Sequence, residues 1–118
     1  LHSVTAGKNG SIATGANGTL LQSRDGAHWQ PQPSPTRKDL YGSSQNGSNY
    51  VSVGDADTIL TSTNGHDWKI QRSGIDKTLV AVDWNGYKYI AIGAEGIILT
   101  SLNGEKWFTQ NSESTALI

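Results

Sequence analysis

The sequence contains no cysteine and no methionine, and it has a single phenylalanine beside four tryptophans and four tyrosines. The absence of cysteine excludes disulfide bonds and thiolate chemistry, but it leaves the cellular compartment open. Apolar runs are short, and none approaches the roughly 20 residues of a membrane-spanning helix. Because even the first residue is not methionine, we expect a processed chain or part of a longer product.

Strong charge of either sign is also lacking, since nine basic and ten acidic residues give a net charge of −1. The basic residues are scattered along the chain, whereas nucleic acids and anionic membranes select a strongly basic face. His2, His28 and His66 are too irregularly spaced to suggest a zinc site. We therefore expect no metal, no other cofactor, no nucleic-acid partner and no membrane insertion.

The residues that are present recur with a constant step. Trp29, Trp68 and Trp107 are separated by 39 positions each time, because 68 − 29 = 39 and 107 − 68 = 39. Leucine, glycine, serine and glutamine columns follow the same step without a gap. The sequence therefore predicts three copies of one unit, at residues 1–39, 40–78 and 79–118.

Each unit has the pattern of short strands separated by tight turns. In the third unit, apolar runs at 79–82, 89–92 and 97–100 are separated by Asn85-Gly86 and by residues 93–96, and Trp107 begins a fourth run. Asn-Gly between apolar runs is a strong hairpin signal. Four antiparallel strands in about 40 residues are typical of a β-propeller blade. Three-stranded β-prism or β-trefoil repeats are the structural alternatives.

A seven-residue motif, Ser-x-(Asp/Asn)-Gly-x-x-Trp, connects the third and fourth expected strands of every unit. Asp or Asn accepts backbone N–H bonds in such turns, glycine supplies a positive φ, and the tryptophan is expected to fold back onto the sheet. We assign these residues a structural role. They are Ser23, Asp25, Gly26 and Trp29, then Ser62, Asn64, Gly65 and Trp68, then Ser101, Asn103, Gly104 and Trp107.

This motif resembles the Asp-box (BNR) repeat of sialidase-like and photosystem-assembly-factor-like β-propellers, and the resemblance covers the whole chain three times. The motif is a shortened variant, because the usual Asp box has one more residue between the acidic residue and the glycine. The resemblance implies that the box lies at the propeller periphery, away from any ligand. It implies an all-β propeller of three four-stranded antiparallel blades.

Three blades leave a propeller open, since rings of this fold need four to eight. The two outermost sheet faces would then expose apolar side chains. We expect the ring to be completed by a second copy, which gives six blades by two-fold symmetry, by a different chain, or by more sequence.

Candidate ligand residues are expected on the face opposite the Asp-box turns. In the family resembled, this second face holds the ligands, and it carries the loops between the second and third strands together with the long blade connectors. Glutamine and serine recur there once per unit, where they either bind a neutral sugar or satisfy neighbouring backbone groups. These residues are Gln32, Ser34, Gln71, Ser73, Gln110 and Ser112.

Four further residues are candidates from single units. Asp55 and Asp57 have a spacing compatible with Ca²⁺ contact or with ordinary turn chemistry, and Glu95 lies in the equivalent loop of the third unit. Trp84 is the one tryptophan outside the repeated column, so it either stacks on a ligand or packs in the core. The proline-rich segment 30–35 is expected to be a stiff connector or a partner-binding loop.

The function that these observations favour is a non-catalytic binding propeller. Sialidases need an arginine triad, but Arg24, Arg37 and Arg72 occupy unrelated positions of the unit, and no nucleophile–base pair is evident. Similarity to bacterial propeller lectins favours a carbohydrate ligand at the blade joints and slightly favours a secreted or cell-surface location. The alternatives are a protein-interaction scaffold and a fragment of a larger propeller enzyme.

Overall fold

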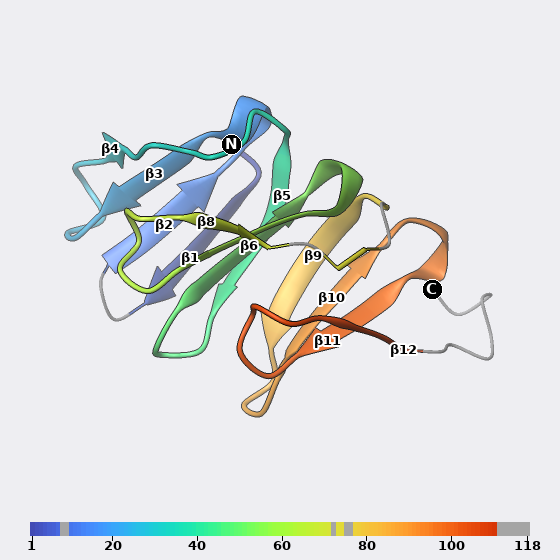
Figure 1. Ribbon diagram of the computed structural model, residues 1–118. Coiled ribbons are helices and arrows are strands. Elements are labelled where there is room, and N and C mark those ends of the chain that lie inside the picture. The colour runs from blue at the N-terminus through green and yellow to red at the C-terminus, as the bar shows by residue number, and fades with distance from the viewer. Residues whose placement is uncertain (8–9, 72, 75–76, 111–118) are drawn as a thin grey trace.

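The computed structural model describes residues 1–7, 10–71, 73–74 and 77–110, and this part of the chain contains twelve short strands (Figure 1). The first sheet contains β1 (Ser3–Gly7), β2 (Gly10–Thr14), β3 (Leu20–Ser23) and β4 (Gln30–Pro31). The second contains β5 (Leu40–Gln45), β6 (Tyr50–Gly54), β7 (Thr58–Ser62) and β8 (Lys69–Gln71). The third contains β9 (Leu79–Trp84), β10 (Tyr89–Gly93), β11 (Ile98–Ser101) and β12 (Phe108–Gln110).

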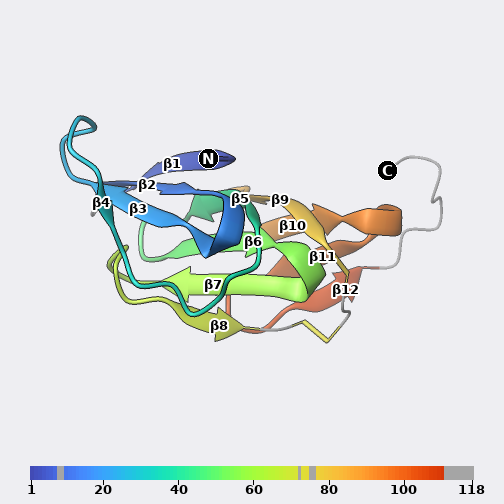
Figure 2. The same cartoon turned by 90° about the horizontal axis from the view of Figure 1, so that it is seen from above.

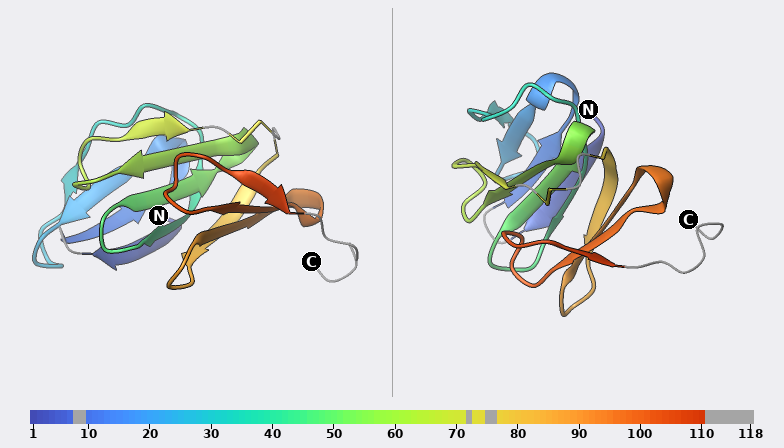
Figure 3. Two further views of the ribbon diagram at one scale, coloured as in Figure 1. Left: turned by 60° about the horizontal axis from the view of Figure 1, so that its bottom comes forward. Right: turned by 45° about the vertical axis from the view of Figure 1, so that its right-hand side comes forward.

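Each sheet pairs its strands antiparallel in chain order, as the Asn-Gly turns predict. The three sheets lie side by side in an open arc, as seen from above in Figure 2 and obliquely in Figure 3. The first strands β1, β5 and β9 contact one another along the inside of the arc, so β4, β8 and β12 lie at its outside. This is the arrangement of blades around a propeller axis, and we call the sheets blades 1, 2 and 3.

The core consists of two joints, where one blade packs on the next. At the joint between blades 2 and 3, Val51, Val53 and Ile59 of blade 2 pack against blade 3. Blade 3 contributes Leu79 and Leu99, together with Val82, Tyr89, Ala91 and Trp107. The joint between blades 1 and 2 uses equivalent positions of the repeat, namely Ile12, Leu20, Leu40, Tyr50, Leu60 and Trp68.

Each blade therefore has two different apolar faces. We call the face that meets the preceding blade the leading face, and in blade 3 it contains Leu79, Leu99 and Trp107. We call the face that meets the following blade the trailing face, and in blade 2 it contains Val51 and Ile59. The 39-residue step puts the same positions on the same face of every blade.

The box turns are held by their own side chains, as the sequence predicts. In blade 2 the Ser62 Oγ accepts the Gly65 N–H at 2.8 Å, and the Asn64 Oδ1 accepts two further backbone N–H groups at 3.0 and 2.9 Å. The Trp68 indole then donates to the Gly65 carbonyl at 3.1 Å. Asp25 organises the turn of blade 1 in the same way, so the motif stabilises the hairpins.

The fourth strands differ from the sequence expectation in position. The sequence predicts that the fourth run begins at the repeated tryptophan, but β4, β8 and β12 each begin one residue after it, at Gln30, Lys69 and Phe108. Strand pairing explains the difference, because Pro31 lies opposite Leu21 and Gln71 lies opposite Ile59. The proline-rich segment is therefore partly an edge strand, a position that tolerates proline.

Candidate functional site

The end of the arc opposite the box turns is built from three equivalent short turns, which we call the turn face. The turns are η1 (Ala16–Gly18), η2 (Asp55–Asp57) and η3 (Ala94–Gly96), and each follows the second strand of its blade. Their central residues Asn17, Ala56 and Glu95 all have left-handed backbone conformations, with φ of 57°, 51° and 62°. Non-glycine residues seldom adopt this conformation, and they persist in it where the surroundings fix them.

The surroundings that fix these turns are the last residues of the blade connectors. The Asp39 Oδ1 accepts the Asn17 N–H of blade 1 at 2.8 Å, and the Asp39 carbonyl accepts the Asp55 N–H of blade 2 at 3.0 Å. Thr78 repeats this arrangement, since its Oγ1 accepts the Ala56 N–H at 3.3 Å and its carbonyl accepts the Ala94 N–H at 2.9 Å. Each connector thus joins two successive turns into one continuous surface.

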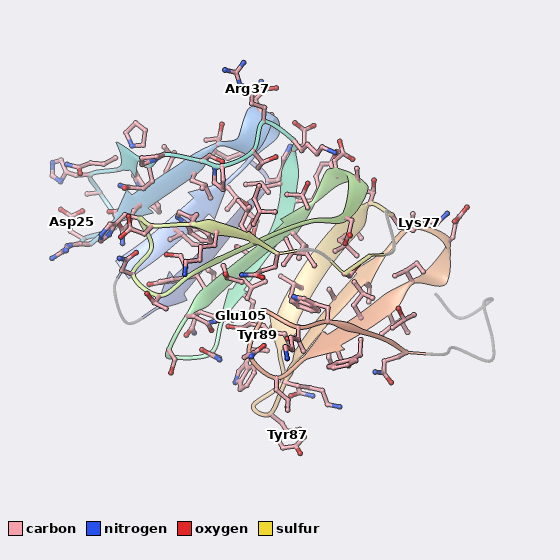
Figure 4. The ribbon with its side chains drawn as sticks, viewed as in Figure 1. Asp25, Arg37, Lys77, Tyr87, Tyr89 and Glu105 are labelled. Carbon is pink, nitrogen blue, oxygen red and sulfur yellow. The ribbon has the colours of Figure 1, made fainter. Side chains whose placement is uncertain are left out.

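Charged groups complete this surface between blades 2 and 3. The Lys77 ammonium forms an ion pair with the Glu95 carboxylate, which lowers the pKa of Glu95. Figure 4 shows Lys77 and Arg37 at this end of the molecule, while Tyr87 lies at the opposite end. The turn face therefore presents both signs of charge.

Two β-bulges turn side chains out of the innermost strands beside these turns. In blade 2 the pairing passes from Leu40 directly to Gly42, and in blade 3 it passes from Leu79 directly to Ala81. The skipped residues are Tyr41 and Val80, and a bulge re-aims the side chain of the extra residue. His2 occupies the equivalent position of blade 1. We call His2, Tyr41 and Val80 the axial row.

The axial row combines ring contacts with exposed apolar surface. The His2 and Tyr41 rings lie 5.3 Å apart with an interplanar angle of 54°, and Val80 keeps 49% of its surface exposed. The Tyr41 hydroxyl donates to the Asp39 Oδ2 at 3.5 Å. Desolvation, followed by the carboxylates of Asp55 and Asp39, raises the pKa of Tyr41. The phenol therefore stays a neutral hydrogen-bond donor at neutral pH.

The predicted glutamine and serine columns lie in contacts within their own blades. The Gln71 amide donates to the Thr61 Oγ1 at 3.3 Å, and the Gln110 amide donates to the Thr100 Oγ1 at 2.8 Å. Gln32 is half-buried and donates to the Gln30 carbonyl at 3.3 Å. Of these three bonds only that of Gln32 reaches a backbone group, and a ligand role for the column stays a prediction.

The serine column is bonded in a similar way. The Ser34 hydroxyl donates to the Thr36 carbonyl at 3.0 Å, and the Ser73 hydroxyl donates to the Asp57 Oδ1 at 2.5 Å. Ser112 lies outside the described residues. The structure does not gather the glutamines and serines of the described blades into one shared pocket.

Asp55 and Asp57 act as turn residues in this structure. The buried Asp57 carboxylate accepts the backbone N–H groups of Ser73 and Gly74 as well as the Ser73 hydroxyl, and the Asp55 Oδ1 accepts the Thr78 hydroxyl at 3.1 Å. Within residues 1–7, 10–71, 73–74 and 77–110, no cluster of three or more acidic, histidine or cysteine side chains could hold a metal ion.

Trp84 packs edge-on against the Tyr89 ring, with centroids 4.9 Å apart, and it borders the apolar cluster of the blade 2–3 joint. The structure thus gives this tryptophan a packing partner.

The sequence does not reveal the axial row, because Tyr41 and Val80 look like ordinary strand residues until the structure shows the bulges. The signal is a break in the two-residue alternation, because Leu79 and Val82 lie three positions apart and are both buried in the same joint.

The comparisons with known proteins bear on the fold. No family model matches the sequence, and no curated protein matches it. Two solved structures superpose closely on the three blades, and both are described as YCF48. One is "YCF48 bound to D1 peptide", with a TM-score of 0.81, 19% identity and coverage of 97% of this chain and 42% of that chain.

The fold is a β-propeller. The second structure, YCF48 from Cyanidioschyzon merolae, has a TM-score of 0.79 and 21% identity, and it covers 97% of this chain and 38% of that one. This chain therefore spans about two fifths of the YCF48 chains that it resembles. The expected open three-blade propeller is confirmed, and a prism or a trefoil is excluded. The finer likeness to Asp-box and sialidase-like proteins stays a prediction.

The part of the chain that the structure describes contains no helix long and apolar enough to cross a membrane.

Proposed function

We propose that this chain is a non-catalytic module that binds a peptide segment of a partner protein on its turn face. The observation that carries the proposal is the axial row, in which two bulges aim a phenol and an isopropyl group out of the sheets beside fixed turns, and an imidazole lies at the equivalent position of blade 1. Aromatic side chains with a polar tip are enriched at protein interfaces, since they offer large contact area at a small entropic cost.

The structural comparison supports the same class of ligand. One YCF48 structure is described as bound to a D1 peptide, so a propeller that superposes on these blades accommodates a polypeptide. The connectors that join successive turns make the surface rigid, and rigidity reduces the entropic cost of binding. No observation on the described residues favours a glycan over a peptide, because the glutamine and serine candidates are spread over separate intrablade contacts.

A peptide-display selection against the purified chain tests the proposal. We expect it to enrich peptides that lose at least about tenfold in affinity for the double variant Tyr41→Ala, Val80→Asp, a loss of about 1.4 kcal/mol. Isothermal titration of one enriched peptide gives the affinities. The matched control is Tyr87→Ala, which removes an aromatic side chain that is 70% exposed at the opposite end of the molecule and should leave affinity unchanged.

Enriched peptides that bind the double variant as tightly as the wild type would place the interface elsewhere. A selection without enrichment, together with binding on a glycan array, would replace the proposal by the carbohydrate interpretation. Circular dichroism checks that the double variant is folded. We expect it to fold, because both substituted side chains lie on the surface near the axis, where little packing is lost.

A further inference from the structure

The hairpins between the first and second strands of blades 2 and 3 share one turn geometry. The Asn46 N–H donates to the Asn49 carbonyl at 3.2 Å, and the Asn85 N–H donates to the Lys88 carbonyl at 3.1 Å. In both turns the first asparagine accepts, through its Oδ1, the backbone N–H groups two and three residues further on at 2.8 to 2.9 Å. The glycine that follows it has a φ of 92° in each turn. The two Asn-Gly pairs can therefore be compared directly.

The two turns differ in the residue that precedes the asparagine. In blade 2 this residue is Gln45, and its Oε1 accepts the Gly47 N–H at 2.6 Å. In blade 3 it is Trp84, whose indole nitrogen can only donate and whose ring packs on Tyr89. Within the residues that the structure describes, no group accepts the Gly86 N–H, and a Cβ built on Gly86 would meet no atom within 4 Å.

We infer that Asn85-Gly86 is a site of spontaneous deamidation, and that it reacts before the other Asn-Gly pairs of the described residues. An asparagine side chain cyclises when the backbone nitrogen of the next residue attacks its Cγ, and a glycine offers no side chain to hinder that attack. A glycine N–H that already donates a hydrogen bond must first give up that bond. The unpaired Gly86 N–H has no such bond to break.

The reaction needs only water as a co-reactant, and nothing is oxidised or reduced. The Gly86 nitrogen forms a bond to the Asn85 Cγ, the bond from Cγ to the side-chain nitrogen breaks, and that nitrogen leaves with the Gly86 proton as ammonia. Water then opens the cyclic imide, its hydroxyl joining a ring carbonyl carbon and its proton joining the ring nitrogen. Opening at Cγ leaves aspartate, whereas opening at the backbone carbonyl leaves isoaspartate, with an additional carbon atom in the main chain.

The Asn-Gly pairs of the box turns are protected by the serine of the motif. The Gly65 N–H donates to the Ser62 Oγ and the Gly104 N–H donates to the Ser101 Oγ, both at 2.8 Å. Both glycines are buried. The nitrogen that would attack is thus bonded and shielded from water in both turns.

The pair in η1 is protected by close packing. Gly18, which follows Asn17, is buried, and a Cβ on it would lie 2.0 Å from the Thr36 carbonyl oxygen. This peptide group therefore has little room to turn toward the asparagine side chain. Asn9, which also precedes a glycine, lies outside the described residues.

The tip of the blade 3 hairpin stays accessible when a further blade follows. In blade 2 the tip residues Gly47 and Ser48 are exposed, although β5 and β6 of that blade pack against β9 of blade 3. Gly86 and Tyr87 occupy the equivalent positions, and Figure 4 shows Tyr87 at the end of the molecule opposite the turn face. The inference is therefore independent of the proposed peptide site.

Deamidation would change both the charge and the geometry of this hairpin. Either product replaces the neutral amide of Asn85 by a carboxylate, which makes the net charge of −1 one unit more negative. Isoaspartate also lengthens the main chain between Trp84 and Gly86, beside the ring contact of Trp84 with Tyr89. The isoaspartyl form should therefore pair β9 with β10 less well.

Peptide mass spectrometry of the wild-type chain, incubated in mildly alkaline buffer, measures both sites in the same molecule. We expect Asn85 to deamidate at least roughly fivefold faster than Asn46, the factor that one net hydrogen bond contributes. Methylation by an isoaspartate-specific methyltransferase then distinguishes isoaspartate from aspartate. Equal rates at the two sites, or a faster rate at Asn46, would overturn the inference without the need for any variant.

Gln45→Leu tests the cause of the difference, because it removes the acceptor of the Gly47 N–H. Deamidation of Asn46 should become roughly fivefold faster, while the rate at Asn85 stays unchanged. The matched control is Gln71→Leu, which removes a glutamine of the same blade that bonds to Thr61 and should change neither rate. Melting temperatures show whether both variants are folded. A folded Gln45→Leu chain with an unchanged rate at Asn46 would refute the protection by Gln45.

Discussion

At the scale of single residues, position 25 and its equivalents show how one side chain organises a hairpin. The Asp25 Oδ1 accepts the N–H groups of Ala27 and His28 at 2.8 and 2.9 Å, while Asn64 and Asn103 do the same in the other blades. The backbone and side-chain bonds from His28 hold the pKa of Asp25 well below its usual range. The carboxylate therefore stabilises the fold only while it is ionised.

We expect Asp25→Asn to reduce the stability that the protein loses when the pH is lowered. Because the folded pKa of Asp25 is depressed, its contribution is complete above the unfolded value of about 3.9 and is lost as the pH falls below that value. Thermal melts between pH 7 and pH 3 measure this. The variant should melt like the wild type at pH 7 and lose less stability at pH 3, and an unchanged acid dependence would contradict the assigned role.

Gly54 shows a steric requirement that its own backbone angle does not reveal. A Cβ at this position would lie 1.9 Å from the Asp39 carbonyl oxygen, in the connector that joins η1 to η2. We expect Gly54→Ala to destabilise the fold by about 1–3 kcal/mol, measured by urea denaturation.

Gly15 is the matched control, because it occupies the position of blade 1 that is equivalent to Gly54. A Cβ on Gly15 would lie 2.9 Å from the Cα of Leu1, which belongs to the first residue and not to a connector between two turns. Gly15→Ala should cost clearly less than Gly54→Ala. Equal losses for the two variants would mean that the connector yields as easily as the terminus.

At the scale of elements, the middle blade is the best-protected part of the chain. Every residue of β6 and β7 is buried, whereas β10 alternates between buried and accessible residues. Amide hydrogen exchange in dilute solution should therefore be slowest in β6 and β7, because local opening follows burial. Faster exchange in these strands than in β1 would contradict the packing described.

The strands themselves follow from the sequence, whereas the candidate site does not. Asn-Gly turns, alternating apolar residues and the tryptophan column define the three sheets, since each signal is local. The bulges at Tyr41 and Val80 depend on how the first strand meets the connector and η turn beside it. Asp39 and Thr78 differ in side chain but make the same backbone contacts, so residue identity does not reveal their shared role.

At the scale of the whole molecule, the open arc was predictable from the count of three units, but the contacts that join one blade to the next were not. The leading and trailing faces of a blade can be assigned only when the structure shows which positions touch at the internal joints. Ala81 is an inconspicuous strand residue in the sequence, and it gains meaning from the approach of Gly42 to the Ala81 backbone.

The narrow space at Gly42 has a consequence for how such chains assemble. A head-to-tail contact closes into a ring only if the rotations between successive blades sum to a full turn; otherwise it propagates as an open helix. Gly42→Ala would wedge blades 2 and 3 apart by its added methyl group and change that rotation. Because all blades of a closed propeller share one full turn, we expect Gly42→Ala to strain any ring that contains these two blades, and a lower melting temperature of the variant would measure that strain.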